Sequence, residues 1–287
     1  MKLVRYGEPG CERPGVWIDD PAGARILDVR GMAFDIADYD AHFFAHHGLA
    51  RVAALARETR RKEIPAAGLR LGPPVARPGK ILCVGKNYAD HAREFDAVVP
   101  TSPVLFSKAA TSWHGPFDDL RIPPGAAAID AEAELAVVIG ATAHRVTEAD
   151  ALRHVAGYTV VNDVTDRQAQ KEGGQWFRGK SADSFCPAGP WLVTADAFDL
   201  AGGASVSSSL NGASLQQGHT RDMIFSVPFL IAFISRAITL EPGDVIATGT
   251  PAGVGFARNP PLLLRDGDTI ACTVEGLGTI TQHVRAG

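Results

Sequence analysis

The sequence predicts a mainly β protein with some helix, which is an α+β fold class. Short apolar runs rich in β-branched residues recur along the chain, and turns that contain Gly and Pro separate them. Few segments place apolar residues at helical spacing, and each of these segments is short. Strands and helices do not alternate regularly, which argues against a doubly wound parallel sheet.

The first predicted elements are two strands and a helix. Residues 16–18 and 25–29 are apolar runs, and residues 19–23 between them carry Asp, Pro and Gly, which are typical of a turn. Residues 49–56 place apolar residues at helical spacing and are followed by charged residues, so they predict a helix.

A segment rich in Pro and Gly, residues 71–79, follows this helix and is the best linker candidate. The chain has 287 residues, which is about two domains of typical length. We therefore expect a small N-terminal domain over residues 1–72 and a larger domain over residues 73–287.

The larger part predicts several strands and two helices. The expected strands are the apolar runs at residues 81–85, 103–108, 135–139 and 157–161. The expected helices cover residues 87–95 and, after a proline, residues 229–234. From residue 244 onwards, short β-rich runs separated by glycine turns indicate more β structure.

Composition excludes several classes of protein. The 28 basic and 32 acidic residues give a net charge of −4 without a long basic run, so neither nucleic acid nor an anionic membrane is an expected partner. No apolar stretch reaches the ~20 residues that span a bilayer. The first residues lack the apolar region of a signal peptide, and the 4 cysteines are scattered. A cytoplasmic protein with reduced thiols is therefore expected.

Three acidic residues lie at the ends of predicted strands. Glu132 and Glu134 are two positions apart, so in a strand their side chains share a face. Asp163 follows another apolar run. Neighbouring buried carboxylates repel unless a cation joins them, and oxygen ligands suit Mg²⁺, Mn²⁺ or Ca²⁺. Read alone, each feature also fits an ordinary exposed strand edge or a turn.

A possible base lies on the predicted helix at residues 87–95. His91 and Glu94 are three positions apart, so they are neighbours on one helix face. Glu94 could orient His91 as a general base for water, although a solvated pair has the same spacing. Lys108 ends a predicted strand and Lys180 is placed in a glycine-flanked loop; either could bind a carboxylate or an oxyanion.

Residues 174–181 match the spacing of a phosphate-binding loop, but their context does not. That motif needs a buried strand before it and a helix after it. Here a polar segment precedes it, while two prolines and a glycine follow it. Nucleotide binding is therefore not expected.

Taken in order, these motifs resemble the fumarylacetoacetate hydrolase family over residues 75–285. Each motif is weak alone, but the ordered set is specific. The motifs are Gly85-Lys86-Asn87-Tyr88 with His91 and Glu94, Leu105-Phe106-Ser107-Lys108, Glu132-Ala133-Glu134-Leu135, Asn162-Asp163-Val164-Thr165, Gly174-Gln175-Trp176, Gly179-Lys180-Ser181, Leu240-Glu241-Pro242-Gly243-Asp244 and Gly249-Thr250-Pro251-Ala252-Gly253-Val254-Gly255.

The resemblance implies a fold and a set of site residues. The implied fold is a mixed β-sandwich roll with a small N-terminal α+β domain, and the implied assembly is a homodimer. The implied ligands of Mg²⁺ or Mn²⁺, with Ca²⁺ as a further candidate, are Glu132, Glu134 and Asp163. The implied catalytic residues are His91, Glu94 and Lys180, and the implied substrate-binding residues are Lys108, Arg167, Gln170 and Thr250.

The resemblance also implies a metal-dependent hydrolase that cleaves a carbon–carbon bond of a 1,3-diketo acid such as an acylpyruvate or fumarylpyruvate, as in aromatic catabolism. The partner expected is a small anionic 2-oxo or diketo acid. The same residues would allow oxaloacetate decarboxylation or tautomerisation, dienedioate isomerisation or ureidoglycolate cleavage. The alternative to an enzyme is an inactive relative that only binds the metal.

Overall fold

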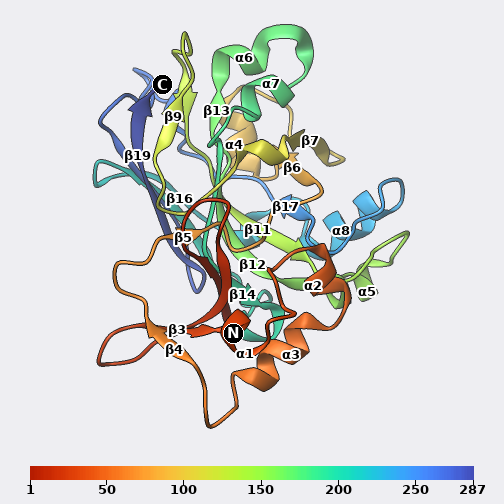
Figure 1. Ribbon diagram of the computed structural model, residues 1–287. Helices are drawn as coiled ribbons and strands as arrows, with labels where there is room; N and C mark the ends of the chain where they lie inside the picture. The colour runs from red at the N-terminus through yellow and green to blue at the C-terminus, as the bar shows by residue number, and fades with distance from the viewer.

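The computed structural model describes residues 1–172 and 174–287, and most of its strands belong to two sheets (Figure 1). The larger sheet has the order β4-β3-β2-β1-β14-β12-β11-β17-β6-β7, with β5 on β1 and β8 on β14. Its strands are β1 (Lys2–Tyr6), β2 (Arg13–Ile18), β3 (Arg25–Asp28), β4 (Glu63–Pro65), β5 (Leu71–Gly72), β6 (Ile81–Gly85), β7 (Val104–Lys108), β8 (Trp113–His114), β11 (Ala133–Ile139), β12 (Val155–Asn162), β14 (Cys186–Thr194) and β17 (Val245–Ala247).

The smaller sheet has the order β16-β15-β18-β19-β9. Its strands are β9 (Leu120–Ile122), β15 (Ser205–Leu210), β16 (Ala213–His219), β18 (Thr269–Val274) and β19 (Gly278–Ala286). Two short strands, β10 (Ile129–Asp130) and β13 (Thr165–Asp166), pair with each other. The α-helices are α1 (Val29–Met32), α2 (Ala41–Ala45), α3 (Gly48–Leu55), α4 (Ala89–Glu94), α5 (Glu148–Ala151), α6 (Arg167–Lys171), α7 (Phe177–Lys180) and α8 (Val227–Ser235).

The central strand β11 is apolar at nearly every position because both of its faces are buried. Leu135 and Val137 belong to a core shared with the smaller sheet, which contributes residues such as Val206. Ala136 and Val138 face the opposite way, into a core that includes Phe43 of α2. Side chains alternate between the two faces of a strand, so a strand covered on both sides reads as one continuous apolar run.

The N-terminal strands are part of the larger sheet. β1 pairs with β14, and Leu3 packs in the same core as Ala136 and Val138 of β11. The division of the chain at residue 72 stays a prediction, but the sheet runs across that position. The N-terminal strands before residue 72 therefore share a core with the central strands.

The larger sheet rolls up at its β7 edge. Strand β7 is four positions from β12 in the sheet, which in a flat sheet would place the two about 19 Å apart. Yet the Nζ atom of Lys108, the last residue of β7, lies 2.6 Å from Oδ1 of Asp163, which follows β12. This curvature brings the ends of distant strands together at one place.

The predicted α+β class, mostly β with some helix, is confirmed. Strand β6 and helix α3 match their predicted ranges to within a residue, and α4 is two residues shorter at its start and one at its end. Lys180 was expected in a loop, but it is the last residue of α7. Among the described residues, no helix is long and apolar enough to cross a membrane.

Candidate active site

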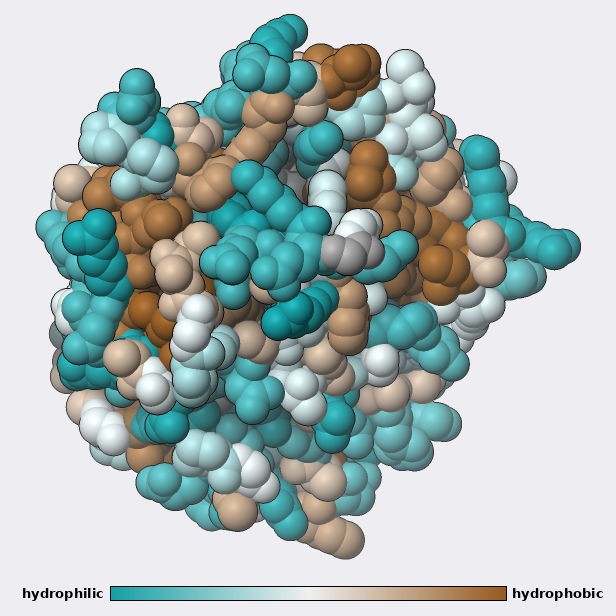
Figure 2. Space-filling model, turned by 90° about the horizontal axis from the view of Figure 1, so that it is seen from above, coloured by the Kyte–Doolittle hydropathy of each residue, from teal (hydrophilic) through white to brown (hydrophobic). Residues whose placement is uncertain are grey.

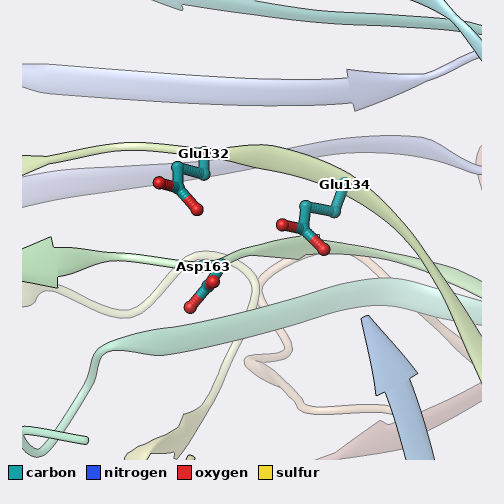
Figure 3. Close-up of side chains that lie close together, drawn as sticks. All are labelled: Glu132, Glu134 and Asp163. Carbon is teal, nitrogen blue, oxygen red and sulfur yellow. The ribbon is translucent and has the colours of Figure 1, made fainter. Parts of the chain in front are cut away.

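Three carboxylates converge where β11 begins and β12 ends (Figure 3). Glu132 precedes β11 and Glu134 lies within it, so the two side chains share a face. The pairing of Ala133 with Asn162 brings Asp163 alongside, and its backbone N–H donates to the carbonyl of Glu132 at 2.9 Å. One oxygen from each carboxylate lies within 4.8 Å of the others, and all three residues are buried.

Two buried lysines neutralise part of this charge. The Nζ of Lys180 donates to Oε2 of Glu132 at 2.7 Å and to Oδ2 of Asp163 at 2.5 Å. The Nζ of Lys108 donates to the other oxygen of Asp163 and to the carbonyl of Val164 at 3.1 Å. Burial would lower the pKa of the Lys180 ammonium, but Asp163 and Glu132 outweigh it and raise that pKa. Lys180 therefore remains charged.

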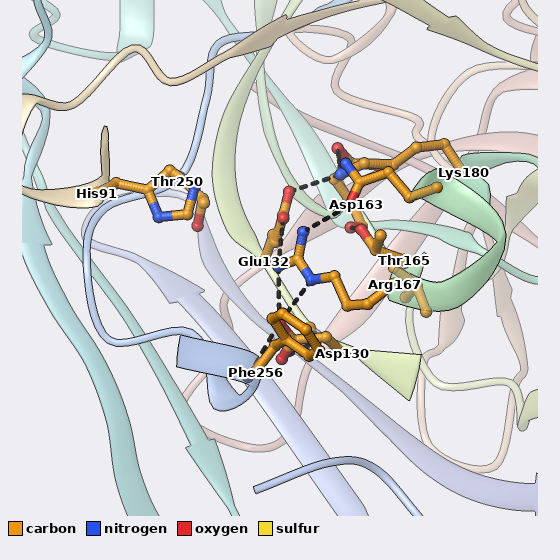
Figure 4. A network of polar contacts seen from close by, with 12 residues as sticks. His91, Asp130, Glu132, Asp163, Thr165, Arg167, Lys180, Thr250 and Phe256 are labelled. Atoms are coloured by element: carbon orange, nitrogen blue, oxygen red, sulfur yellow. Dashed lines mark hydrogen bonds and ion pairs between the residues drawn. The ribbon is translucent and has the colours of Figure 1, made fainter. Parts of the chain in front are cut away.

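Arg167, the first residue of α6, is the third buried cation (Figure 4). Its guanidinium donates twice to Oδ2 of Asp130, at 2.9 and 2.6 Å, and lies 2.7 Å from Oε1 of Glu132. The aromatic rings of Phe95 and Phe256 flank it, with its central carbon 5.5 and 5.9 Å from their centroids. These contacts fix the direction of the guanidinium.

Glu134 is the carboxylate without a cation. No described lysine or arginine lies within ion-pair distance of it, and its Oε2 accepts only the backbone N–H of Gly249, at 2.8 Å. Burial, together with the nearby charges of Asp163 and Glu132, raises the pKa of Glu134 well above its ordinary value. The pKa of Glu132 shifts the other way: burial would raise it, but Lys180 and Arg167 lower it.

This charge balance fits a divalent cation. Four buried carboxylates, counting Asp130, lie among three basic side chains, so one negative charge would be uncompensated if all four carboxyl groups were ionised, in line with the raised pKa of Glu134. The three converging carboxylates offer only oxygen ligands, the donors that Mg²⁺, Mn²⁺ and Ca²⁺ prefer. A divalent ion held by Glu132, Glu134 and Asp163 would turn the local excess positive, which suits an anionic substrate.

The predicted His–Glu pair forms on α4. Nδ1 of His91 lies 3.0 Å from Oε2 of Glu94. A carboxylate only accepts, so Nδ1 carries a proton, and in the neutral imidazole Nε2 of His91 is then the acceptor. The other oxygen of Glu94 accepts the backbone N–H of Gly253 at 2.5 Å, which ties α4 to the loop after β17. The pair is therefore held at both ends.

A cavity of about 330 Å³ joins these groups. His91, Glu132, Glu134, Arg167, Gln170, Lys180 and Thr250 line it, together with the aromatic rings of Phe95, Phe106 and Trp176. Seen from above, the face with α4, α6 and α7 mixes hydrophobic and hydrophilic side chains (Figure 2). A pocket with a few converging polar groups and an apolar wall is typical of a site for a small organic molecule.

Lys108 does not line this cavity. Its side chain is completely buried, and its ammonium binds Asp163, which does not line the cavity either. Residues 174–181 do not form a phosphate loop either: Phe177–Lys180 is a short helix, and the lysine binds carboxylates instead.

Sequence reasoning missed two buried polar residues near the site. Asp130 holds Arg167, and Gln216 on β16 hydrogen-bonds to Thr250. Asp130 follows a short apolar run, and Gln216 is one of two adjacent glutamines in a polar strand, so neither residue belongs to a recognisable motif. Only their contacts with the site distinguish them from surface residues.

Comparison with known proteins points to one family. A model of the C-terminal domain of fumarylacetoacetate hydrolase matches residues 80–285. A Burkholderia multivorans protein is 46% identical over 288 residues, which cover 100% of this chain and 99% of that protein. The mitochondrial oxaloacetate tautomerase of Rattus norvegicus is 38% identical over 286 residues, 99% of this chain and 91% of that one.

A solved structure agrees with these matches. The maleylpyruvate hydrolase from Sphingobium has 32% sequence identity and a TM-score of 0.82, and the match covers 100% of both chains. The shared fold therefore includes the N-terminal residues as well as the cavity.

Proposed function

Because the chain belongs to the fumarylacetoacetate hydrolase family, we propose that it cleaves a carbon–carbon bond of a 1,3-diketo acid, such as an acylpyruvate or fumarylpyruvate, with a divalent cation. Family membership supports an enzyme of the hydrolase, isomerase or tautomerase kind. The diketo substrate, the metal and the roles of individual residues are the finer parts of the proposal.

One observation carries the proposal: His91, whose Nδ1 contacts Glu94, lines the same cavity as Glu132 and Glu134, two carboxylates of the buried triad. A base for water is needed for hydrolysis but not for simple metal binding. An oxygen-ligand metal site is needed to hold a 2-oxo acid. Their coincidence in one pocket favours a metal-assisted hydrolysis.

Glu132, Glu134 and Asp163 would hold Mg²⁺ or Mn²⁺, with Ca²⁺ as a weaker candidate. When bound, such an ion supplies positive charge that polarises a chelated 2-oxo carboxylate. The protein's part is to orient the ligands: Lys180 and the backbone N–H of Gly249 already fix one oxygen each of Glu132 and Glu134.

His91 acts as the general base. Its Nε2 takes a proton from a water molecule, while Glu94 stabilises the imidazolium that forms. The oxygen of this water attacks the carbonyl distal to the carboxylate. Such a positioned base contributes about 10²- to 10⁴-fold in rate.

The carbon–carbon bond then breaks, and its electron pair passes to the pyruvate fragment as an enolate. Lys180 and Arg167, both buried and charged, face the cavity where this negative charge develops. The water oxygen leaves in the released carboxylic acid. A proton returns to the enolate carbon to give pyruvate, so the two products together equal the substrate plus water.

The rival reaction is keto–enol tautomerisation of oxaloacetate, because the rat relative carries that activity in its name. Decarboxylation, dienedioate isomerisation and ureidoglycolate cleavage would also use the cation-lined pocket without an attack by water. An inactive relative is disfavoured because His91 lines the same cavity as Glu132 and Glu134. We further propose that the protein is a homodimer in the cytoplasm and that it takes part in aromatic catabolism.

A substrate panel with Mg²⁺ or Mn²⁺ tests it. Acylpyruvates, fumarylpyruvate, oxaloacetate and a dienedioate are scored separately for bond cleavage, CO₂ release and enol formation. The proposal expects cleavage of a diketo acid to one carboxylic acid and one pyruvate. Enol formation from oxaloacetate without cleavage of any diketo acid would replace it with the tautomerase function.

A further inference from the structure

Gln216 lies outside the cavity, yet its carboxamide hydrogen-bonds to Thr250, which lines the cavity, and to Ala133, which lies between Glu132 and Glu134. It is fully buried on β16, a strand of the smaller sheet. Its Oε1 accepts the backbone N–H of Ala133 at 3.0 Å and the hydroxyl of Ser208 at 2.8 Å. Its Nε2 donates to Oγ1 of Thr250 at 2.6 Å and to the carbonyl of Pro251 at 2.8 Å.

These four bonds use every donor and acceptor that the carboxamide has. They also fix its orientation, because exchanging its oxygen and nitrogen would place a donor against the N–H of Ala133. A fully satisfied buried network of this kind rigidifies the segments that it joins. Gln216 therefore holds two different segments at a set distance from each other.

The first segment is the one that carries two of the proposed metal ligands. Ala133 lies between Glu132 and Glu134, so a hydrogen bond to its N–H fixes the backbone from which both carboxylates project. Its carbonyl is held as well, by the hydroxyl of Thr250 at 2.9 Å. Both backbone groups of Ala133 are thus bound by the same small network.

The second segment is the loop after β17. Its close approach to β16 depends on glycine: a Cβ added at Gly218 would lie 2.3 Å from Cβ of Pro251. One at Gly253 would lie 2.5 Å from the carbonyl oxygen of Leu215. The same Gly253 donates its N–H to Glu94. The contact between β16 and this loop therefore also supports the partner of His91.

The hydrogen bonds of Gln216 decide what Thr250 can do. The hydroxyl of Thr250 accepts from Gln216 and donates its only proton to Ala133. Towards the cavity it can therefore only accept. This differs from the expected role, in which Thr250 would bind a carboxylate or an oxyanion, because both of these need a donor. His91 and Thr250 line the same cavity, and an acceptor there suits the protons of a water molecule.

We infer that Gln216 is a positioning residue, which fixes the Glu132–Glu134 segment for metal binding and turns the Thr250 hydroxyl into an acceptor towards the cavity. This inference rests on the proposed function, since it concerns the same carboxylates. Residues that orient metal ligands in this way typically change metal affinity or activity about 10- to 100-fold when altered.

The test compares Gln216→Met with Ser208→Ala. Methionine has a similar length and no strong donor, so it removes all four hydrogen bonds. Ser208→Ala removes one bond to the same carboxamide but leaves its contacts with Ala133 and Thr250. Mn²⁺ affinity is measured by electron paramagnetic resonance on each full-length protein, beside its thermal unfolding midpoint.

We expect Gln216→Met to weaken Mn²⁺ binding at least about 10-fold, and Ser208→Ala to stay within twofold of the unaltered chain even at an equal loss of thermal stability. Equal affinities in the unaltered chain and Gln216→Met would overturn the inference and leave the proposed function intact. An unaltered chain that binds no Mn²⁺ would overturn both.

If Gln216→Met does not fold, Thr250→Val tests the same inference. Valine keeps the shape of threonine but removes the bond to the carbonyl of Ala133 and the acceptor for Gln216. Weaker Mn²⁺ binding by this variant, whose valine lies outside the triad, supports the network. Unchanged binding contradicts it.

Discussion

The ammonium of Lys180 lies 2.5 Å from Oδ2 of Asp163, with both side chains almost completely buried. It also binds Glu132, so a single lysine joins two of the three carboxylates proposed as metal ligands. Breaking such a pair leaves an uncompensated buried charge, which is strongly destabilising. The protein thus keeps its acidic cluster folded with a fixed cation and still has Glu134 without a cationic partner.

Replacing this lysine should separate metal binding from turnover. Lys180→Met removes the positive charge nearest the developing enolate, so we expect kcat/KM to fall by about 10²- to 10³-fold. Mn²⁺ affinity should be retained or increased, because the ammonium no longer competes for the oxygens of Glu132 and Asp163. Steady-state kinetics and Mn²⁺ titration measure the two effects. Weaker Mn²⁺ binding with a normal kcat at saturating Mn²⁺ would show that the lysine serves only the metal site.

His91→Asn tests the base. We expect a loss of kcat of about 10²- to 10⁴-fold on the hydrolysed substrate, with Mn²⁺ affinity unchanged, because the imidazole takes the proton of water but is not a proposed ligand. Arg93→Ala is the matched control: it lies on the same helix and pairs only with exposed Asp90. If both variants retain full turnover, His91 is not the base.

Lys108→Met distinguishes a structural lysine from a substrate-binding one. Its side chain is not exposed at all, and the substitution would leave Asp163 with one oxygen unpaired. We expect the free energy of unfolding to fall by about 3–5 kcal/mol in urea, with little change in KM. Lys2→Met, which breaks an exposed pair with Asp19, should cost less than about 1 kcal/mol. A raised KM at unchanged stability would instead restore the expected substrate contact.

The pH dependence of stability should report on Asp28. Burial would raise the pKa of this carboxyl, but Lys62, Arg13 and the backbone N–H of Gly31 outweigh it and lower that pKa. A pKa lowered on folding adds stability above the ordinary value near 4, and this stability is lost as the pH falls through the folded pKa. Unfolding midpoints between pH 5 and 3 should therefore fall less steeply in Asp28→Asn.

The control for this slope is Asp35→Asn. Asp35 also pairs with an arginine, but both side chains are about half exposed, so solvent screens the pair. Arg51 lowers the pKa of Asp35 as well, but because of this screening we expect the slope to change much less in Asp35→Asn than in Asp28→Asn. An identical slope in Asp28→Asn would show that this carboxyl titrates alike in the folded and unfolded chains.

The strands and the acidic triad could be predicted because each has a local signal. Residues 135–139 are an uninterrupted apolar run, and Glu132 and Glu134 share a face by their spacing alone. The His91–Glu94 pair follows from helical spacing in the same way. Within each of these two pairs the residues are close in the sequence, whereas Asp163, the third carboxylate, is 29 positions from Glu134 (163 − 134) and is predicted from its place after another apolar run.

The contacts that could not be predicted join residues far apart in the chain. Lys108 meets Asp163 only because the sheet rolls up, and strand curvature has no simple sequence pattern. Gln216 reaches Ala133 across the two sheets, over 83 positions of sequence. Spacing rules describe one helix or one strand, so they do not indicate which side chains meet between elements.

The central claim is that this cavity hydrolyses a diketo acid with a divalent cation held by Glu132, Glu134 and Asp163. The most direct measurement follows the ultraviolet absorbance of acetylpyruvate with chelator-treated protein, before and after Mg²⁺ or Mn²⁺ is added, in the unaltered chain and in Glu134→Gln. The account predicts no turnover without the ion, restored formation of acetate and pyruvate in equal amounts with it, and little restoration in Glu134→Gln. Full turnover by the chelated protein, or equal restoration in the variant, would contradict it.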